Sequence, residues 1–397
     1  MRADFFKHQA QTSSHPLAIE VDWAKGSYIF DKKGKKYLDF IAGVSANTLG
    51  HGHPAVNNAV IAQLDRYSHV MVYGEFIQEA PVQLAKSLTA LCPSGMDSVY
   101  LTNSGTEATE AALKLAKRVT GRSEIIAAKN AYHGNTQGAM SVCGNELKKS
   151  AFRPLIPGTS FITYNAFDEL EKITDQTAAV ILETIQGGAG FIAPVPQYLA
   201  TVKQRCEAVG ALLILDEIQT GIGRTGTFFG FENFQVVPDM IIAGKGLGGG
   251  MPIGALITNR ATMSAFQSNP PLGHITTFGG HPVIAAAGLA TLNTVIESDL
   301  MPEALRKEAL FRAHLQHPAI KEIRGKGLLL ALLFENEEMA SKVILACLDK
   351  GLLLFWLLFE GRAVRITPPL TITEGEIKAG CDLLLDVISA LHVAGSI

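Results

Sequence analysis

The sequence has no surplus of positive charge and no hydrophobic run long enough to cross a membrane. Charged residues make up 18% of the chain and the formal net charge is −3, which excludes the basic footprint of a nucleic-acid-binding protein. The apolar runs GLLLAL at 327 and GLLLFWLLF at 351 fall well short of the roughly 20 residues that span a bilayer. We expect both runs to form core strands or a buried helix.

The sequence also lacks closely spaced cysteines. Its five cysteines are far apart and no C-x-x-C pair occurs; from the opening MRADFFKHQAQ we expect no secretory leader. This pattern is typical of a protein from a reduced compartment, so we expect a cytoplasmic location and no metal site.

The chain is long enough for two domains, because single domains run to roughly 100 to 200 residues and this chain has 397. Between about residues 98 and 260, short Val/Ile/Leu runs alternate with helix-like stretches, which favours a mostly parallel sheet covered on both faces. We predict a large α/β domain over residues 51–284. Segments 1–50 and 285–397 are predicted to join as a smaller α+β domain, with YIFDKKGKKYLDF forming a hairpin around Gly34.

Ligands of open α/β sheets bind at the carboxyl ends of the strands, and the first such end is TNSGTEATEAALKLAKR. Apolar residues at helical spacing follow Ser104 and Glu107, which have the S-x-x-E pattern of a capping box. Gly105 lets a ligand approach the backbone closely, and free N–H groups at a helix N-terminus can bind a phosphate. Taken alone, the stretch is more typical of an ordinary helix cap.

The second strand end is ALLILDEIQTGIGRTG, in which five apolar residues lead directly into Asp216 and Glu217. An ionised carboxylate that leaves water costs several kcal/mol unless it meets a cation or hydrogen-bond donors. Side chains alternate in direction along a strand, so only one of the two carboxylates can face a given ligand. We expect a positive partner at Asp216 and loop donors at Glu217.

The third strand end, DMIIAGKGLGGGMPIGA, places Lys245 in an apolar and glycine-rich run. Desolvation lowers the pKa of such a lysine toward that of a nucleophilic amine, which makes Lys245 a Schiff-base candidate, although a surface lysine on a loop is the alternative. The same stretch satisfies G-x-G-x-x-G, but Pro252 and a strand-like run follow where that fingerprint requires a helix. A dinucleotide site is therefore not expected.

A phosphate cradle, an aspartate and a buried lysine together indicate pyridoxal phosphate. This cofactor needs a phosphate site, a lysine for its aldehyde and an acidic partner for its ring nitrogen. Asp216 would then be tolerated at its strand end because it holds the proton of a pyridinium ring.

Seven stretches resemble, in order and spacing, the class III (subgroup II) aminotransferases, which include ornithine, acetylornithine and 4-aminobutyrate aminotransferases. They are NSGTEATEAALKLAKR, AYHGNTQGA, ETIQGG, LILDEIQTGIGRTG, AGKGLGGGMPIGA, TTFGGHP and VRITPPLTI, and the resemblance covers about residues 15–390. It implies a fold-type I enzyme that contacts its cofactor through Ser104, Gly105, Thr106, Tyr132, Glu183, Asp216, Ile218, Gln219 and Lys245.

The resemblance also implies a homodimer with shared sites and a guanidinium for the substrate. Thr277 would reach the partner's phosphate across the subunit boundary, and Arg365 would bind a substrate carboxylate in two parallel hydrogen bonds. His133, in the YHG turn, is interpreted mainly as a residue that holds this loop.

Two positions depart from the ornithine-type pattern. Asn135 stands where an arginine is common, and Gly188 replaces a glutamate that normally pairs with the arginine at 365. Glu75 is a candidate to replace that glutamate.

The implied reaction moves an amino group from an amino acid to a 2-oxo acid such as 2-oxoglutarate, with Lys245 holding the cofactor and then transferring the proton. An ω-amino acid is the first expectation for the donor. An α-amino acid or diamine transaminase and an aminomutase are the alternatives. A non-catalytic binding protein of this fold should lack Lys245 or Asp216, and a dehydrogenase is a distant possibility.

Overall fold

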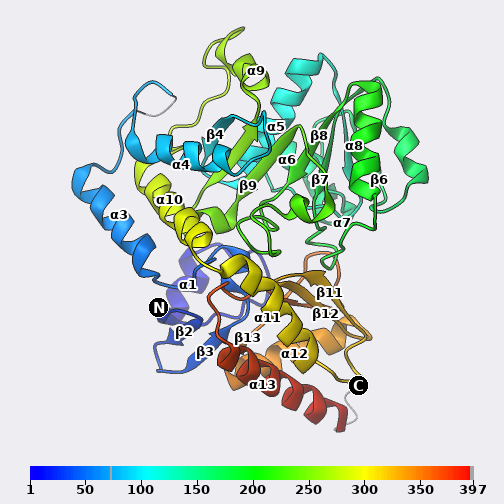
Figure 1. Ribbon diagram of the computed structural model, residues 1–397. Coiled ribbons are helices and arrows are strands. Elements are labelled where there is room, and N and C mark those ends of the chain that lie inside the picture. Colours follow the sequence, from blue (N-terminus) through cyan, green and yellow to red (C-terminus); the bar gives the residue numbers. More distant parts are fainter. Residues whose placement is uncertain (72–73, 394–397) are drawn as a thin grey trace.

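A seven-stranded sheet forms the centre of the computed structural model, which describes residues 1–71 and 74–393 (Figure 1). The strand order is β4 (Ser98–Thr102), β10 (Gly254–Thr258), β9 (Met240–Gly244), β8 (Leu212–Asp216), β7 (Thr177–Glu183), β5 (Glu124–Ala128) and β6 (Thr159–Ile162). Strand β10 runs antiparallel to both of its neighbours, and the pairs from β9 to β6 are parallel. The prediction of a mostly parallel central sheet is therefore confirmed.

Both faces of the large sheet are buried, as the continuous apolar runs predict. Along β7, Ala179 and Ile181 share a core with α5 (Gly105–Thr120), while Val180 and Leu182 face the opposite core. That second core contains residues of α4 (Glu79–Ala90), α8 (Tyr198–Val209) and α10 (Pro282–Glu297). Because neither face meets water, polar groups of this sheet concentrate at its strand ends.

Two smaller sheets lie beside the large one, in the lower half of Figure 1. The first has the order β1 (Val21–Lys25), β2 (Tyr28–Asp31), β3 (Lys36–Asp39) and β13 (Leu352–Leu353); the second has the order β11 (Glu322–Lys326), β12 (Leu329–Leu333), β15 (Ala363–Ile366) and β14 (Phe355–Trp356). The hairpin around Gly34 is confirmed by the antiparallel pairing of β2 with β3. Strand β13 pairs with β3 in parallel, so the two ends of the chain share a sheet.

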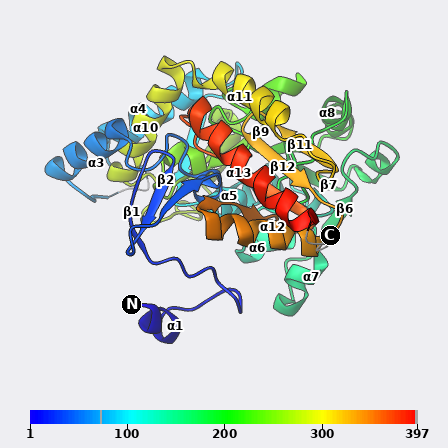
Figure 2. The same cartoon turned by 90° about the horizontal axis from the view of Figure 1, so that it is seen from below.

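The remaining helices surround these sheets (Figures 1 and 2). They are α1 (Arg2–His8), α2 (Ala42–Ser45), α3 (Pro54–Arg66), α6 (Gln137–Ser141), α7 (Glu146–Lys149), α9 (Arg260–Met263), α11 (Leu300–His314), α12 (Glu337–Lys350) and α13 (Glu374–Val393), with 3₁₀ turns η1 (Ser150–Phe152), η2 (Asp168–Lys172), η3 (Gly230–Phe234), η4 (Lys245–Gly248) and η5 (Ser264–Gln267). All four residues of α2 have positive φ, so this element is a left-handed turn.

The core packing of α10 bears on the predicted domain boundary after residue 284. Ala285, Leu292 and Val295 of this helix pack into the large-sheet core, so that boundary would divide a helix. The packing favours a boundary between α10 and α11, and the division of the chain into domains stays a proposal.

Within the described ranges, no single helix is long and apolar enough to cross a bilayer. Only α10 and α11, taken together across their 71° bend, meet the requirements of length and composition.

Candidate active site

A cavity of about 440 Å³ lies where the carboxyl ends of the central strands meet. Strand β7 ends at Glu183, β8 ends at Asp216, and Lys245 directly follows β9. Glu183 and Asp216 are paired in the register of β7 and β8, so the two carboxylates are neighbours. The cavity is lined by Val44, Gly105, Thr106, Tyr132, His133, Gly134, Asn135, Glu183, Ile185, Gly188, Asp216, Ile218, Gln219, Thr220, Lys245, Phe355, Trp356, Leu358 and Arg365.

The N-terminus of α5 forms one wall of this cavity. Ser104 is the N-cap, and its hydroxyl accepts a hydrogen bond of 3.4 Å from the backbone N–H of Glu107. The predicted capping box is only half correct, because Glu107 reaches back to the N–H of Asn103 at 2.7 Å rather than to the cap residue. Gly105 leaves room for Ile218, since a Cβ there would lie 2.5 Å from Cδ1 of Ile218 and displace that side chain.

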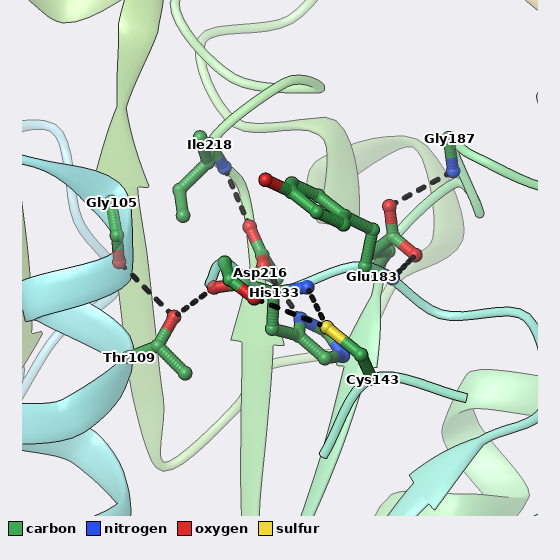
Figure 3. Close-up of polar contacts among 10 residues, drawn as sticks. Gly105, Thr109, His133, Cys143, Glu183, Gly187, Asp216 and Ile218 are labelled. Carbon is green, nitrogen blue, oxygen red and sulfur yellow. Dashed lines mark hydrogen bonds and ion pairs between the residues drawn. The ribbon is translucent and has the colours of Figure 1, made fainter. Parts of the chain in front are cut away.

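Asp216 contacts the side chain of His133, a residue that the sequence analysis interpreted mainly as holding its own loop. Its Oδ2 lies 2.7 Å from Nδ1 of His133, and its Oδ1 accepts a 3.0 Å bond from the N–H of Ile218 (Figure 3). The backbone of His133 holds the loop as expected, because its carbonyl accepts a hydrogen bond from Thr109 and its N–H donates to Cys143. The correction concerns its side chain, which supports Asp216.

Glu217 faces away from the cavity and is surrounded by donors. Its carboxylate accepts hydrogen bonds from the hydroxyls of Thr184 and Thr220 at 2.5 and 2.6 Å, and from the N–H groups of Gly230 and Phe231 at 2.7 and 2.9 Å. Burial raises its pKa to about 7. This arrangement confirms that the two adjacent carboxylates point in different directions and that Glu217 binds loop donors.

Glu183 fixes two loops around the cavity. It accepts hydrogen bonds from the backbone N–H groups of Tyr132 at 3.1 Å and of Gly187 at 3.0 Å (Figure 3). Burial raises its pKa to about 7. Gln219 lies next to the same loop, because a Cβ on Gly187 would be 2.7 Å from its Oε1.

Lys245 stands at the turn from β9 into η4, with a φ of 40°. Burial lowers the pKa of its amine, an effect that the Asp216 carboxylate partly opposes. A 3₁₀ turn and β10 follow the lysine, so the predicted strand is found where a dinucleotide-binding loop would require a helix.

Arg365 enters the cavity from β15, in the second small sheet, and is only 4% exposed. Its Nε and Nη1 atoms are buried and have no hydrogen-bond partner within the described residues, and its guanidinium lies 5.4 Å from the Phe191 ring centre. Burial lowers its pKa to about 10, which leaves it charged at neutral pH. A buried, unpaired guanidinium is suited to bind a ligand carboxylate.

It was not predicted from the sequence that part of the GLLLFWLLF run lines the cavity. The run was expected to be core, and Leu352 and Leu353 are indeed buried. Phe355 and Leu358, however, are 38% and 48% exposed and line the cavity with Trp356. Phe355 is paired with Arg365 in the register of β14 and β15, a long-range relationship that an apolar run alone does not reveal.

Three predicted residues lie outside the cavity lining of this single chain. Ser104 acts as the cap of α5, while Thr277 and Glu75 are exposed. Gly188 is in the lining, and its carbonyl accepts a 2.9 Å hydrogen bond from the N–H of Phe359.

The residues present fit pyridoxal phosphate. The first turn of α5 presents N–H groups without intrahelical partners to a phosphate, Asp216 can face the ring nitrogen, and Lys245 can hold the aldehyde. The cavity volume falls within the roughly 300 to 1,000 Å³ of small-molecule sites.

Comparisons with known proteins agree with this fit. The family model described as Aminotransferase class-III matches residues 9–388. The chain is 41% identical over 379 residues to acetylornithine aminotransferase of Bacillus subtilis (strain 168), covering 94% of this chain and 95% of that protein. It is 38% identical over 380 residues to the acetylornithine aminotransferase of Caldanaerobacter subterraneus subsp. tengcongensis, covering 93% and 94%.

A solved structure of ornithine aminotransferase from Toxoplasma gondii ME49 superposes on the chain with a TM-score of 0.92. The two are 30% identical, and the match covers 99% of this chain and 96% of the other. Fold, family model and relatives agree: this chain belongs to the class III aminotransferases, a family of pyridoxal-phosphate-dependent transaminases.

Proposed function

We propose that this enzyme takes its amino group from an amino acid whose reacting amine is remote from its carboxylate, and passes it to a 2-oxo acid. Acetylornithine and ornithine aminotransferases are its relatives, and the names of both describe donors of this kind. The observation that carries the proposal is the guanidinium of Arg365, which has no partner in the part of the chain that the structure describes and shares its cavity with Lys245. One group can hold a substrate carboxylate while the other acts at the amine.

When bound, pyridoxal phosphate supplies an aldehyde that accepts the amino group and a ring that withdraws electrons from the reacting carbon. We assign Lys245 to the aldehyde end, where its free amine also moves the proton of the substrate's amine-bearing carbon. Asp216, supported by His133, holds the proton on the ring nitrogen. Arg365 orients the substrate through its carboxylate.

The other cavity residues complete the proposed cofactor site. Gly105 and Thr106 bind the phosphate from the start of α5, with Ser104 fixing that turn. Tyr132 and Ile218 cover the two ring faces. Glu183 and Gln219 order the loop at Gly187, which we place beside the hydroxyl of the cofactor ring.

We also propose a homodimer in which each subunit completes the site of the other. Residues 74–85 and 274–280 form a groove on which Phe76, Ile77 and Ile275 are exposed, Ile77 by 97%. Apolar side chains gathered on one surface mark an interaction site, and a second copy is the occupant that the predicted role of Thr277 requires. Size measurement of the purified protein tests this arrangement.

An α-amino acid donor is the second candidate, and one observation favours it. No carboxylate within the described residues forms an ion pair with Arg365, so the guanidinium is open to an α-carboxylate as well.

A cytoplasmic location also stays a proposal, supported by the five free cysteines.

The decisive experiment mixes the purified enzyme with single amines in the absence of any oxo acid. Conversion of the cofactor's absorbance by ornithine, N-acetylornithine or 4-aminobutyrate, faster than by alanine or glutamate, supports an ω-amino donor. Faster conversion by the α-amino acids would favour the second candidate. Turnover of one amine into an isomer without an oxo acid would instead indicate an aminomutase.

A further inference from the structure

The cavity offers a single positive charge to the substrate. Among the described residues that line it, the charged groups are Asp216, Glu183, Lys245 and Arg365, besides the buried His133. The proposed function assigns Lys245 and Asp216 to the cofactor, and Glu183 is engaged by two backbone N–H groups. Arg365 is therefore the one cation of this lining that remains for a substrate carboxylate.

The surface next to Arg365 consists of carbon. Phe355 lies opposite Arg365 in the strand register, and Trp356 and Leu358 continue the same wall. The indole N–H of Trp356 donates to the hydroxyl of Ser341 at 3.0 Å, so its one polar atom is already paired. This wall, formed by Phe355, Trp356 and Leu358, offers contact to an apolar group and no hydrogen bond from its side chains.

The neutral polar groups of the lining do not replace a second cation. Thr106 is hydrogen-bonded to Thr136, and Gln219 donates to the hydroxyl of Ser45. The groove of the proposed dimer contact, residues 74–85 and 274–280, contains no Lys or Arg that could supply a further cation from the second copy. A second substrate carboxylate would lose its water here without gaining a positive partner, which is costly.

We propose that this enzyme selects 2-oxo acceptors with one carboxylate. Arg365 binds that carboxylate, and the apolar side chain of the acceptor packs on the wall of Phe355, Trp356 and Leu358. The acceptor is then a monocarboxylic 2-oxo acid in preference to 2-oxoglutarate. This inference rests on the proposed function, because it assumes that Lys245 and Asp216 are occupied by the cofactor.

The exchange itself balances without a further reagent. The C–N bond of the donor breaks, and the donor carbon takes its new carbonyl oxygen from water. A C–N bond forms at the acceptor's carbonyl carbon, and the acceptor's oxygen leaves as water. The donor carbon loses two electrons and the acceptor carbon gains two.

The test compares two acceptors with the same five-carbon chain. Enzyme loaded with pyridoxamine phosphate is mixed rapidly with 2-oxopentanoate or with 2-oxoglutarate, and the return of the aldehyde form is followed by absorbance. We expect the second-order rate constant to be at least tenfold larger for 2-oxopentanoate. A rate constant for 2-oxoglutarate that equals or exceeds it would overturn the inference.

A binding measurement provides a readout without turnover. Pentanoate and glutarate are unreactive and differ by one carboxylate, so calorimetric titration of the holoenzyme compares their affinities directly. Pentanoate should bind at least tenfold more tightly, and equal or tighter binding of glutarate contradicts the proposal. Because the acceptor test starts from supplied pyridoxamine phosphate, it remains valid even if every candidate amine fails in the donor test.

A matched pair of variants at Asn135 tests whether the lack of a second cation in the cavity sets the preference between the two acceptors. Asn135 lines the cavity and is exposed, so its replacement disturbs little packing. Asn135→Arg should raise the rate with 2-oxoglutarate relative to 2-oxopentanoate by at least tenfold, whereas Asn135→Gln, the uncharged control, should leave the ratio within twofold. An unchanged ratio in Asn135→Arg, or the same change in both variants, would contradict the assignment of selectivity to missing charge.

Discussion

Nδ1 of His133 lies 2.7 Å from Oδ2 of Asp216, and both side chains are almost completely buried. Nε2 of the histidine has no partner within the described residues, so a neutral ring carries its proton on Nδ1 and donates it to the carboxylate. The histidine therefore positions Asp216 and stabilises its negative charge.

Replacing His133 by Phe should weaken the hold of Asp216 on the cofactor. Hydrogen bonds to charged groups contribute about 1.5 to 3 kcal/mol, so we expect the single-turnover rate to fall roughly tenfold to a hundredfold. The pH dependence of the cofactor's absorbance should change at the same time, which a purely structural role would not cause. His133→Asn, which keeps a donor, should restore part of both properties; a spectrum and rate unchanged in His133→Phe would contradict this role.

Replacing Asp216 by Asn should preserve the fold and abolish most of the activity. The amide has nearly the same volume, but it cannot hold a proton on the ring nitrogen. We expect a rate loss of at least about a hundredfold, comparable to the loss of a proton-transfer group, with little change in thermal stability. Equal rates in the variant and the natural enzyme would assign the role to another group. Glu217 is excluded geometrically, because it is not among the residues that line the cavity and its carboxylate is already held by four donors.

Introducing a carboxylate at Gly188 should reveal whether the open guanidinium of Arg365 sets the affinity for carboxylates. Any Cβ at position 188 would lie 2.8 Å from the Phe359 ring, so this ring or the loop must shift, at a cost of about 1 to 3 kcal/mol in stability. Gly188→Ala carries this steric cost alone and serves as the control. We expect Gly188→Glu to bind pentanoate at least tenfold more weakly than Gly188→Ala, and equal binding would contradict a pairing with Arg365.

The native protein should react slowly with thiol reagents at pH 8. Burial raises the pKa of all five cysteines above the ordinary value, to about 11 for Cys143 and about 12 for Cys92, Cys206, Cys347 and Cys381. The reactive thiolate is therefore scarce at pH 8 and becomes more abundant as the pH rises. A colorimetric disulfide reagent should label five thiols after denaturation and label the native protein far more slowly; one rapidly labelled thiol in the native state would contradict this.

Local patterns were enough to predict much of this molecule. The runs ending at Asp216 and Lys245 identified strands and strand ends, and the alternation of side chains separated Asp216 from Glu217. Contacts between distant parts of the chain were not predictable in this way. His133 and Asp216 are 83 positions apart, and the hydrogen bond from Phe359 to Gly188 joins two different sheet regions.

Apolar patterning alone also could not separate the core from the cavity wall. Leu353 and Phe355 belong to one continuous apolar run, yet the first is buried and the second faces the cavity. The difference depends on the pairing of β14 with β15, which brings Phe355 beside Arg365.

The assignment of Lys245 as the residue that holds the cofactor is the central claim, and borohydride reduction followed by peptide mapping tests it most directly. The amine follows β9, lines the cavity with Asp216 and has a pKa lowered by burial. The account predicts that reduction fixes the cofactor permanently to the peptide containing Lys245, and that Lys245→Ala protein retains no covalent label. A label on any other lysine, or none in the natural protein, would contradict it.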